Sequence, residues 1–185
     1  MEALVTIAIP DITDLEALTA TLQALARHTL EPYEVVLLEL EGQGRNDTNI
    51  REIVVSAPFS APTALNQLVV MCTTPYILLL ESGAVVTAGW LRRLLAPFED
   101  AGVGLSGPST NICWNEQQVM PRPVGIGWSV GQIDAYAASV ADRYHDQVRS
   151  LDTLHGLADF CYLFRRSVPE QLGGFDEAYG AGPCW

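Results

Sequence analysis

The stretch YILLLESGAVVTAGWL, residues 76–91, decides the fold class of this chain. It opens with a short apolar run between Pro75 and Gly83, and a run of this length with such boundaries is typical of a buried strand. Glu81 follows the run directly, so we expect its carboxylate at the carboxyl end of that strand. Open α/β sheets bind their ligands at this edge. The stretch therefore predicts a strand with a site at its end.

Short strands alternate with helices along the rest of the chain. Apolar runs predict further strands at residues 5–9, 34–38, 53–56, 103–106 and 157–165. Helical spacing of apolar residues and helix-end signals predict helices at residues 15–25, 61–71, 88–98, 130–148 and 167–172. We expect Asp11 or Thr13 to cap the first helix and Thr87 to cap the helix that carries Trp90. This alternation predicts an α/β fold with an open, mainly parallel, doubly wound sheet and helices on both faces.

The composition is that of one globular, acidic domain. The 185 residues are 49% hydrophobic and 17% charged, which allows a substantial core. The formal net charge of -12 argues against a nucleic-acid partner, because there is no basic footprint to neutralise phosphates. The amino terminus lacks a signal-peptide pattern, and no apolar stretch is long enough to span a bilayer. We therefore expect a cytoplasmic protein without a membrane span.

The cysteines and histidines form no metal-binding pattern. Cys72, Cys113, Cys161 and Cys184 show no CxxC spacing, and His28, His145 and His155 show no HxxxH or HExxH spacing. We expect reduced thiols that are mostly buried, and histidines that are not metal ligands.

Several separated segments, taken in order, resemble those of family 2 glycosyltransferases. They are VTIAIP at residues 5–10, EVVLLE at 34–39, Ala64-Leu65-Asn66, the stretch at 76–91, and FRR at 164–166 followed by LGGFDE at 172–177. The ordered set spans almost the whole chain. The resemblance implies a nucleotide-diphospho-sugar-binding, Rossmann-like domain that transfers a sugar to an acceptor hydroxyl. The implied partners are a nucleotide-diphospho-sugar donor and a glycan or other hydroxyl acceptor, with a divalent cation (Mn²⁺ or Mg²⁺) as cofactor.

The resemblance also implies which residues contact the donor. Glu39 falls at the position of the acid that contacts the nucleoside, and Pro10 and Asp11 fall where the first loop touches the base. Glu81 and Ser82 begin the metal triplet, but Gly83 replaces the acid that binds the cation directly. With Glu81 as its one carboxylate ligand, the cation should be held weakly. The implied donor contacts are Pro10, Asp11, Glu39, Asn66, Glu81 and Ser82.

Each of these residues also has a structural interpretation. Glu39 and Glu81 could cap neighbouring helices, and Asn66 could satisfy backbone groups. Trp90 lies at core spacing on its helix, whereas Trp114 lies in an irregular segment and either stacks on a sugar or anchors its loop.

Asp176 and Asp159 are the candidates for the catalytic base. In the family the base lies in an acidic motif shortly after GGFDE, and this sequence ends before such a motif. Asp176 either caps the next helix or faces the acceptor side of the cleft. Asp159 is flanked by apolar residues, so we expect it to be partly buried unless it faces a cleft.

Two explanations for this ending remain open. Residues 1–185 are either the amino-terminal piece of a longer transferase domain, which we favour, or a degenerate, non-catalytic module that binds or scaffolds. We expect the chain alone to bind better than it catalyses. A nucleotidyltransferase ranks last, because residues 10–14 are not a Gly-rich loop that carries a Lys or Arg.

Overall fold

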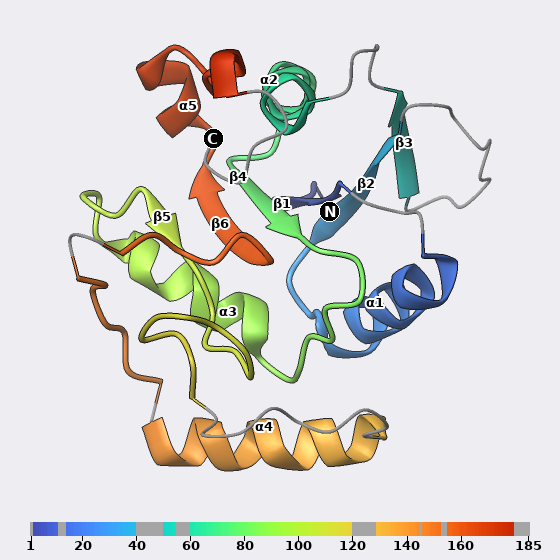
Figure 1. The fold of residues 1–185 in the computed structure, drawn as a ribbon, viewed down its shortest axis with the longest axis vertical. Helices are drawn as coiled ribbons and strands as arrows, with labels where there is room; N and C mark the ends of the chain where they lie inside the picture. The colour runs from blue at the N-terminus through green and yellow to red at the C-terminus, as the bar shows by residue number, and fades with distance from the viewer. Residues whose placement is uncertain are drawn as a thin grey trace.

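The computed structural model describes residues 2–10, 14–39, 50–54, 60–119, 129–144, 146–152 and 155–179. Strands and helices alternate along them, as Figure 1 shows. In chain order the elements are β1 (Val5–Ile9), α1 (Leu15–His28), β2 (Tyr33–Glu39), β3 (Ile50–Val54), α2 (Ala61–Met71), β4 (Tyr76–Leu80), α3 (Trp90–Leu95), η1 (Ala96–Glu99), β5 (Leu105–Ser106), α4 (Val130–Tyr144), β6 (Cys161–Arg165), α5 (Ser167–Leu172) and η2 (Glu177–Tyr179).

The strands form one six-stranded sheet in the order β3-β2-β1-β4-β6-β5. β1 pairs in parallel with β2 and β4, and β2 pairs in parallel with β3. β6 is antiparallel to both of its neighbours, β4 and β5. The predicted α/β class and mainly parallel sheet are therefore confirmed, with one antiparallel strand inserted near an edge.

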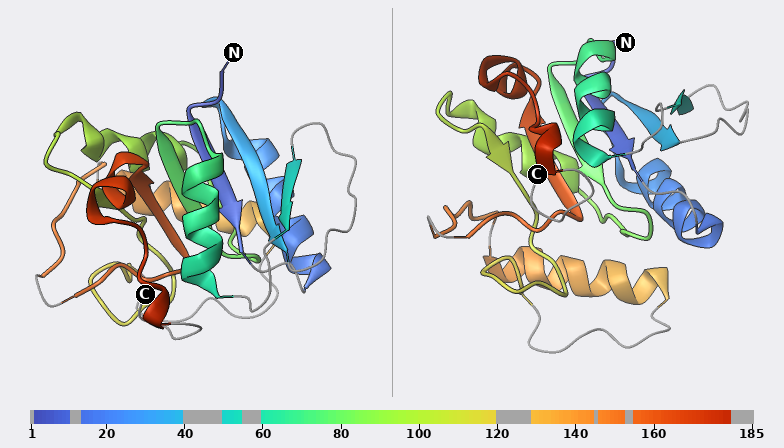
Figure 2. Two further views of the ribbon diagram at one scale, coloured as in Figure 1. Left: turned by 90° about the horizontal axis from the view of Figure 1, so that it is seen from above. Right: turned by 45° about the horizontal axis from the view of Figure 1, so that its top comes forward.

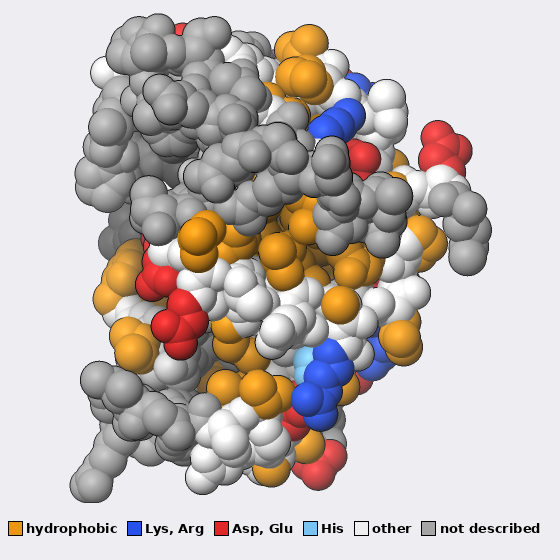
Figure 3. Space-filling view, turned by 90° about the vertical axis from the view of Figure 1, so that its right-hand side faces the viewer, with side chains coloured by type: hydrophobic (Ala, Val, Ile, Leu, Met, Phe, Trp, Pro, Cys, Tyr) orange, Lys and Arg blue, Asp and Glu red, His pale blue; other side chains and the backbone are white. Residues whose placement is uncertain are grey.

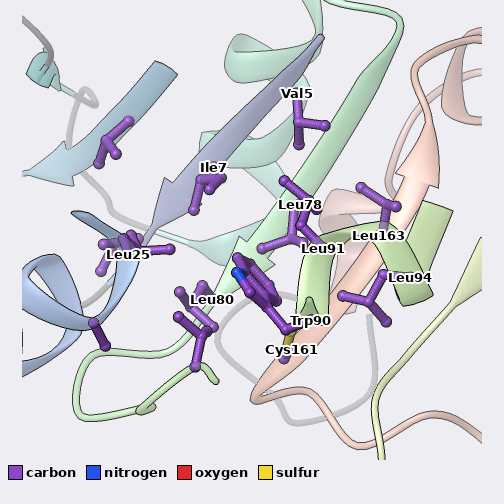
Figure 4. Packing of buried hydrophobic residues seen from close by; sticks show 14 of the residues in the cluster. Val5, Ile7, Leu25, Leu78, Leu80, Trp90, Leu91, Leu94, Cys161 and Leu163 are labelled. Atoms are coloured by element: carbon purple, nitrogen blue, oxygen red, sulfur yellow. The ribbon is translucent and has the colours of Figure 1, made fainter. Parts of the chain in front are cut away.

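Helices cover both faces of the sheet, as the two views in Figure 2 show. On one face, α1 and α3 pack against alternate residues of the central strands; Figure 4 shows part of this cluster, with Trp90 and Leu91 facing Leu78 and Leu80. On the other face, α2 packs against the intervening residues, including Ile77 and Leu79. Because the four residues from Ile77 to Leu80 are buried from both sides, β4 reads as a continuous apolar run.

The residues that cap two helices differ from the sequence prediction. Asp14, not Asp11 or Thr13, caps α1: its Oδ1 accepts hydrogen bonds from the amides of Glu16 and Ala17, both at 3.0 Å. Asp11 and Thr13 lie outside the described residues.

The start of α3 also differs from the prediction. The residue before its first turn is Gly89, at φ +71°, and no side chain caps the helix. Thr87 contributes its backbone carbonyl to the amide of Trp90 at 3.2 Å, so the predicted Thr87 side-chain cap is wrong. A glycine in the left-handed region can turn the chain into the helix without the steric cost that a Cβ would add.

The last long helix, α4, lies along one end of the molecule, below the sheet in Figure 1. None of its residues is buried. Asp134 on α4 joins it to α1 through Arg27 at 3.3 Å and His28 at 3.1 Å. Polar side-chain contacts with Asp134, rather than apolar burial, therefore connect this helix to α1. No helix in the described part of the chain is long and apolar enough to cross a membrane.

Figure 3 shows one face of the molecule, seen from the right-hand side of Figure 1. Acidic side chains are scattered over it with hydrophobic ones between them, and the basic side chains form small separate groups. The described part of this face thus carries no broad basic patch, which agrees with the net charge of -12.

Candidate functional site

The register of the sheet brings the predicted site residues to one edge. Ala8 of β1 is paired with Val36 of β2 on one side and with Leu79 of β4 on the other. Pro10 and Glu81 each lie two residues beyond that level, and Glu39 is the last residue of β2, one residue further. β1 alone separates β2 from β4, so the backbones at Glu39 and Glu81 are about two strand spacings, or roughly 10 Å, apart. They share the carboxyl edge, as the sequence predicts; Asp11 lies outside the described residues.

The turn that carries Glu81 is held by backbone hydrogen bonds. The amide of Glu81 donates to the carbonyl of Phe160 at 2.7 Å, which continues the pairing of β4 with β6. The amide of Ala84 donates to the carbonyl of Glu81 at 3.1 Å and closes the turn. Gly83 lies inside it at φ +92°, a conformation that side-chain-bearing residues rarely adopt. The backbone therefore favours glycine at the position where the family resemblance expects an acid.

Ser82 lies in the same turn. Its Oγ is buried, and among the described residues it has no hydrogen-bond partner. A buried hydroxyl without a partner loses its interactions with water and gains none in return.

A pocket of about 1130 Å³ opens beside this turn. It extends from the turn across the β6–β5 end of the sheet, on the face that α2 covers further along. Its described lining comprises residues 81–84, 104–105, 110–114 and 156–160 together with Tyr162, Phe164, Val168, Pro169, Leu172, Gly174 and Phe175. This described lining contains two carboxylates, those of Glu81 and Asp159, and no arginine or lysine. The pocket is thus apolar and aromatic, with acidic groups next to the carboxyl edge.

The wall of the pocket that follows β5 is fixed by the side chain of Gln117, which is buried. Its Nε2 donates to the carbonyl of Pro108 at 2.9 Å, and its Oε1 accepts from the amide of Ala158 at 2.8 Å. Asn115 adds a 2.8 Å bond from Nδ2 to the carbonyl of Gly156. Two segments that are about forty residues apart in sequence are therefore joined side by side.

Trp114 lies on this wall, with 68% of its surface exposed. Its ring meets the His155 ring edge to face, with the centroids 5.3 Å apart. His155 Nδ1 in turn lies 2.8 Å from a carboxylate oxygen of Glu116. The backbone amide of Glu116 and its contact with His155 lower the pKa of the Glu116 carboxyl. Trp114 is thus a loop residue with an open ring at the pocket, as its irregular sequence context predicts.

The two candidate bases have different surroundings. Asp159 is exposed and lines the pocket next to Phe160. Of the two predicted alternatives, that it is partly buried or that it faces a cleft, the structure supports the second. Its charge contributes to a raised pKa of Tyr162, of which burial is the larger cause. Asp176 is exposed and accepts a 2.9 Å hydrogen bond from the amide of Ala178, and so caps η2. It is not among the described residues that line the pocket.

Asn66 is the predicted donor contact whose surroundings the structure defines most fully. It lies on α2, and both ends of its side-chain amide are hydrogen-bonded to the segment that follows α5. The predicted structural role, that of satisfying backbone groups, is therefore present, although the partners lie more than a hundred residues away rather than at a helix start.

The residues described fit a divalent cation poorly. No group of three or more His, Cys, Asp or Glu side chains that could hold a metal ion occurs in the described part of the chain. Glu81 is the single predicted ligand, and Gly83 offers no side-chain donor. A cation here would depend on a substrate phosphate and water for the rest of its oxygen ligands, an arrangement that Mg²⁺ in particular uses.

Thr21 contributes to the site although the sequence analysis did not single it out. It is fully buried on α1, and its Oγ1 accepts a 2.8 Å hydrogen bond from the amide of Gly83. Its position between Leu18 and Leu25 at helical spacing places it on the buried stripe of α1, which is the signal that could have revealed it.

Solved structures of glycosyltransferases share this fold. A mannosyltransferase from Pyrobaculum calidifontis, PcManGT, determined with GDP-Man and Mn²⁺, is 16% identical with a TM-score of 0.61, and the match covers 99% of this chain and 50% of that chain. TarS 1-349 of S. aureus is 12% identical with a TM-score of 0.59, covering 95% and 51%. TarS 1-349 with UDP-GlcNAc is 13% identical with a TM-score of 0.56, covering 92% and 48%. No protein-family model and no curated protein matches the chain.

The chain therefore has the nucleotide-diphospho-sugar transferase fold, known as the glycosyltransferase A fold, as the sequence resemblance implied. It spans about half the length of the solved structures that it matches. At these levels of sequence identity, the structural similarity shows the fold alone.

Proposed function

We propose that this chain is part of a glycosyltransferase that transfers a sugar from a nucleotide-diphospho-sugar donor to a hydroxyl group of an acceptor. The observation that carries the proposal is the shared carboxyl edge: Glu39 ends β2, and Glu81 follows β4, two strands along the sheet and next to an aromatic pocket. Ligands bind at this edge of open α/β sheets. The fold is that of proteins determined with GDP-Man or UDP-GlcNAc, which supports a donor of the same chemical class.

In this proposal the donor lies across the ends of β1, β2 and β4. Pro10, Asp11 and Glu39 contact the nucleoside, and Glu81 with Ser82 lies toward the diphosphate. The acceptor hydroxyl attacks the anomeric carbon, the bond from that carbon to the diphosphate breaks, and a carboxylate takes the hydroxyl proton. Asp159 is better situated for this proton transfer than Asp176, because it lines the pocket and Asp176 caps η2.

A divalent cation would be held by Glu81 and the donor phosphates. When bound, it supplies positive charge that stabilises the leaving diphosphate. With one protein carboxylate, we expect the contribution of the cation to binding to be small.

The direct test is isothermal titration calorimetry of the chain with UDP and with GDP, each with and without Mn²⁺. We expect one of the two nucleotides to bind, and Glu81→Gln to remove the gain in affinity that Mn²⁺ gives. Glu99→Gln is the matched control, because Glu99 is exposed at the end of η1, away from the carboxyl edge. A chain that binds neither nucleotide, or whose response to Mn²⁺ is unchanged by Glu81→Gln, would contradict the proposal.

A further inference from the structure

The side chain of Asn66 is paired with the segment that follows α5. Its Oδ1 accepts a 2.8 Å hydrogen bond from the amide of Phe175, and its Nδ2 donates to the carbonyl of the same residue at 3.0 Å. Nδ2 also lies 2.9 Å from Oε1 of Glu177. The carboxamide thus presents its acceptor and its donor to the two backbone groups of a single residue. Figures 1 and 2 show η2 beside α2, in line with these bonds.

Two glycines make this approach possible. Gly173 ends α5 at φ +89°, and Gly174 follows at φ +97°. A Cβ on Gly174 would lie 2.8 Å from Oδ1 of Asn66, closer than real Cβ contacts come. The amide of Gly174 also donates to the carbonyl of Pro169 at 2.8 Å, which closes the end of the helix. The Gly-Gly turn therefore gives both the left-handed backbone and the close contact that the Asn66 pairing needs.

The segment held in this way forms part of the pocket. Gly174 and Phe175 are among its lining residues, and the ring of Phe175 packs edge to face on Phe164 of β6, with the centroids 5.8 Å apart. The backbone that carries Asp176 lies between Phe175 and Glu177, the two residues bonded to Asn66. A change at Asn66 thus reaches the wall of the pocket without any contact with a ligand.

We infer that Asn66 is a positioning residue: it fixes residues 174–177 against α2 and so sets one wall of the acceptor side of the pocket, instead of contacting the donor. The assignment to the acceptor side rests on the proposed function; the fixing of the segment does not. A carboxamide is suited to this task because it donates and accepts at once, whereas an ionised carboxylate only accepts. An aspartate at this position would face the carbonyl of Phe175 and the carboxylate of Glu177 without a proton to donate.

The test measures hydrogen exchange of the Phe175 amide together with UDP or GDP affinity. In Asn66→Ala the protection of this amide should fall roughly tenfold, as expected when a local hydrogen bond of ordinary net strength is lost. Nucleotide affinity should stay within about twofold of that of the unaltered chain, since a residue that makes no ligand contact removes no binding free energy. Gln67→Ala, one residue along α2, is the matched control and should change neither quantity.

Asn66→Asp gives a second readout that a merely space-filling role would not produce. It should destabilise the segment at neutral pH, and the added change Glu177→Gln should restore it, because the introduced glutamine side chain can donate to the new carboxylate. Glu177→Gln alone should have little effect, since an acceptor oxygen is kept. Asn66→Asp, alone and combined with Glu177→Gln, keeps the side-chain volume. These two variants therefore test the role of Asn66 even if Asn66→Ala does not fold.

Unchanged Phe175 protection in Asn66→Ala and no rescue of Asn66→Asp by Glu177→Gln would overturn the inference. Nucleotide affinity that falls more than about tenfold with Phe175 protection unchanged would overturn it in favour of a donor contact. If the unaltered chain binds no nucleotide, the proposed function fails, and exchange and rescue still decide the role of Asn66.

Discussion

The backbone amide of Gly83 donates a 2.8 Å hydrogen bond to Oγ1 of Thr21. The same hydroxyl lies 3.2 Å from the carbonyl of Ala17, one turn earlier in α1, to which it donates. Thr21 therefore connects the buried face of α1 to the turn that carries Glu81. Because strand β4 and the amide of Glu81 fix the other side of this turn, its position depends on both α1 and β6.

Replacing Thr21 with valine should loosen this turn. Valine keeps the shape of threonine but removes the acceptor for the Gly83 amide, so we expect the free energy of unfolding to fall by about 1–2 kcal/mol. Thr21→Ser is the matched control because it keeps the hydroxyl. Urea denaturation measures the stability, and calorimetry measures nucleotide affinity, which should fall with Thr21→Val and less with Thr21→Ser. Equal stability of the valine variant and the unaltered chain would mean that the bond contributes nothing.

Replacing Gly83 with aspartate should strengthen the dependence of nucleotide binding on Mn²⁺, because it restores a second carboxylate. The backbone imposes a cost: at φ +92° a side chain is strained, and we expect a loss of about 1 kcal/mol in stability. Space is not the obstacle, since a Cβ there would meet the Cβ of Ala17 at 3.6 Å, an ordinary contact. Gly83→Asn is the control that has the same strain without the charge. If both variants bind UDP with the same response to Mn²⁺, the restored acid is not a metal ligand.

The two tryptophans Trp90 and Trp114 should differ sharply in their effect on stability. Trp90 is 8% exposed, and its Nε1 donates to Oγ1 of Thr29 at 3.1 Å. Trp90→Ala should cost about 3–5 kcal/mol through lost burial and a residual cavity. Trp114 is 68% exposed, so Trp114→Ala should change the free energy of unfolding by no more than about 0.5 kcal/mol. Denaturant titrations that give equal costs for the two changes would contradict this assignment of core and loop.

The fold could be predicted from the sequence because, in its central elements, the apolar pattern and the boundary residues indicate the same strand or helix. β1 was predicted with its observed bounds, and so was α2, Ala61–Met71, whose start is marked by the capping residue Ser60. The predicted strand at residues 157–165 and helix at 130–148 are shorter in the structure, Cys161–Arg165 and Val130–Tyr144, since element ends depend on pairing partners that sequence periodicity does not contain.

Caps were the least predictable local feature. Asp11, Thr13 and Asp14 all offer an oxygen within four residues of the start of α1, and propensity alone does not select the third. At α3 a left-handed glycine replaces the expected side-chain cap.

In the candidate site as well, local features could be predicted from the sequence and long-range contacts could not. The position of Glu81 at the end of a strand follows from local sequence and is confirmed. The pairing of Asn66 with Phe175 joins residues 109 positions apart, so no local pattern could predict it. Asp159 reaches the pocket because β6 runs antiparallel to β4, a feature that an alternating strand-helix pattern does not predict.

Burial of Cys161 should make both its reactivity and its contribution to stability depend on pH. Burial raises the pKa of this thiol to about 12, and it raises the pKa of the Cys72 thiol as well. At pH 8 in the native state we expect iodoacetamide to modify the partly exposed Cys113 before Cys72 and Cys161, as measured by mass spectrometry of the intact and digested chain. Cys184 lies outside the described residues.

The effect on stability follows from the direction of the pKa change. An unfolded cysteine ionises near pH 8.5 and the folded Cys161 near pH 12, so the unfolded state loses its proton first. The free energy of unfolding is thus unaffected by this thiol below about pH 8.5 and falls as the pH rises towards about 12. At pH 9.5 the loss from Cys161 should be on the order of 1 kcal/mol relative to pH 7.5. Cys161→Ala lowers stability at both pH values but should reduce this difference. Urea titrations in which Cys161→Ala and the unaltered chain lose the same stability between pH 7.5 and 9.5 would show that Cys161 ionises as easily in the folded chain as in the unfolded one.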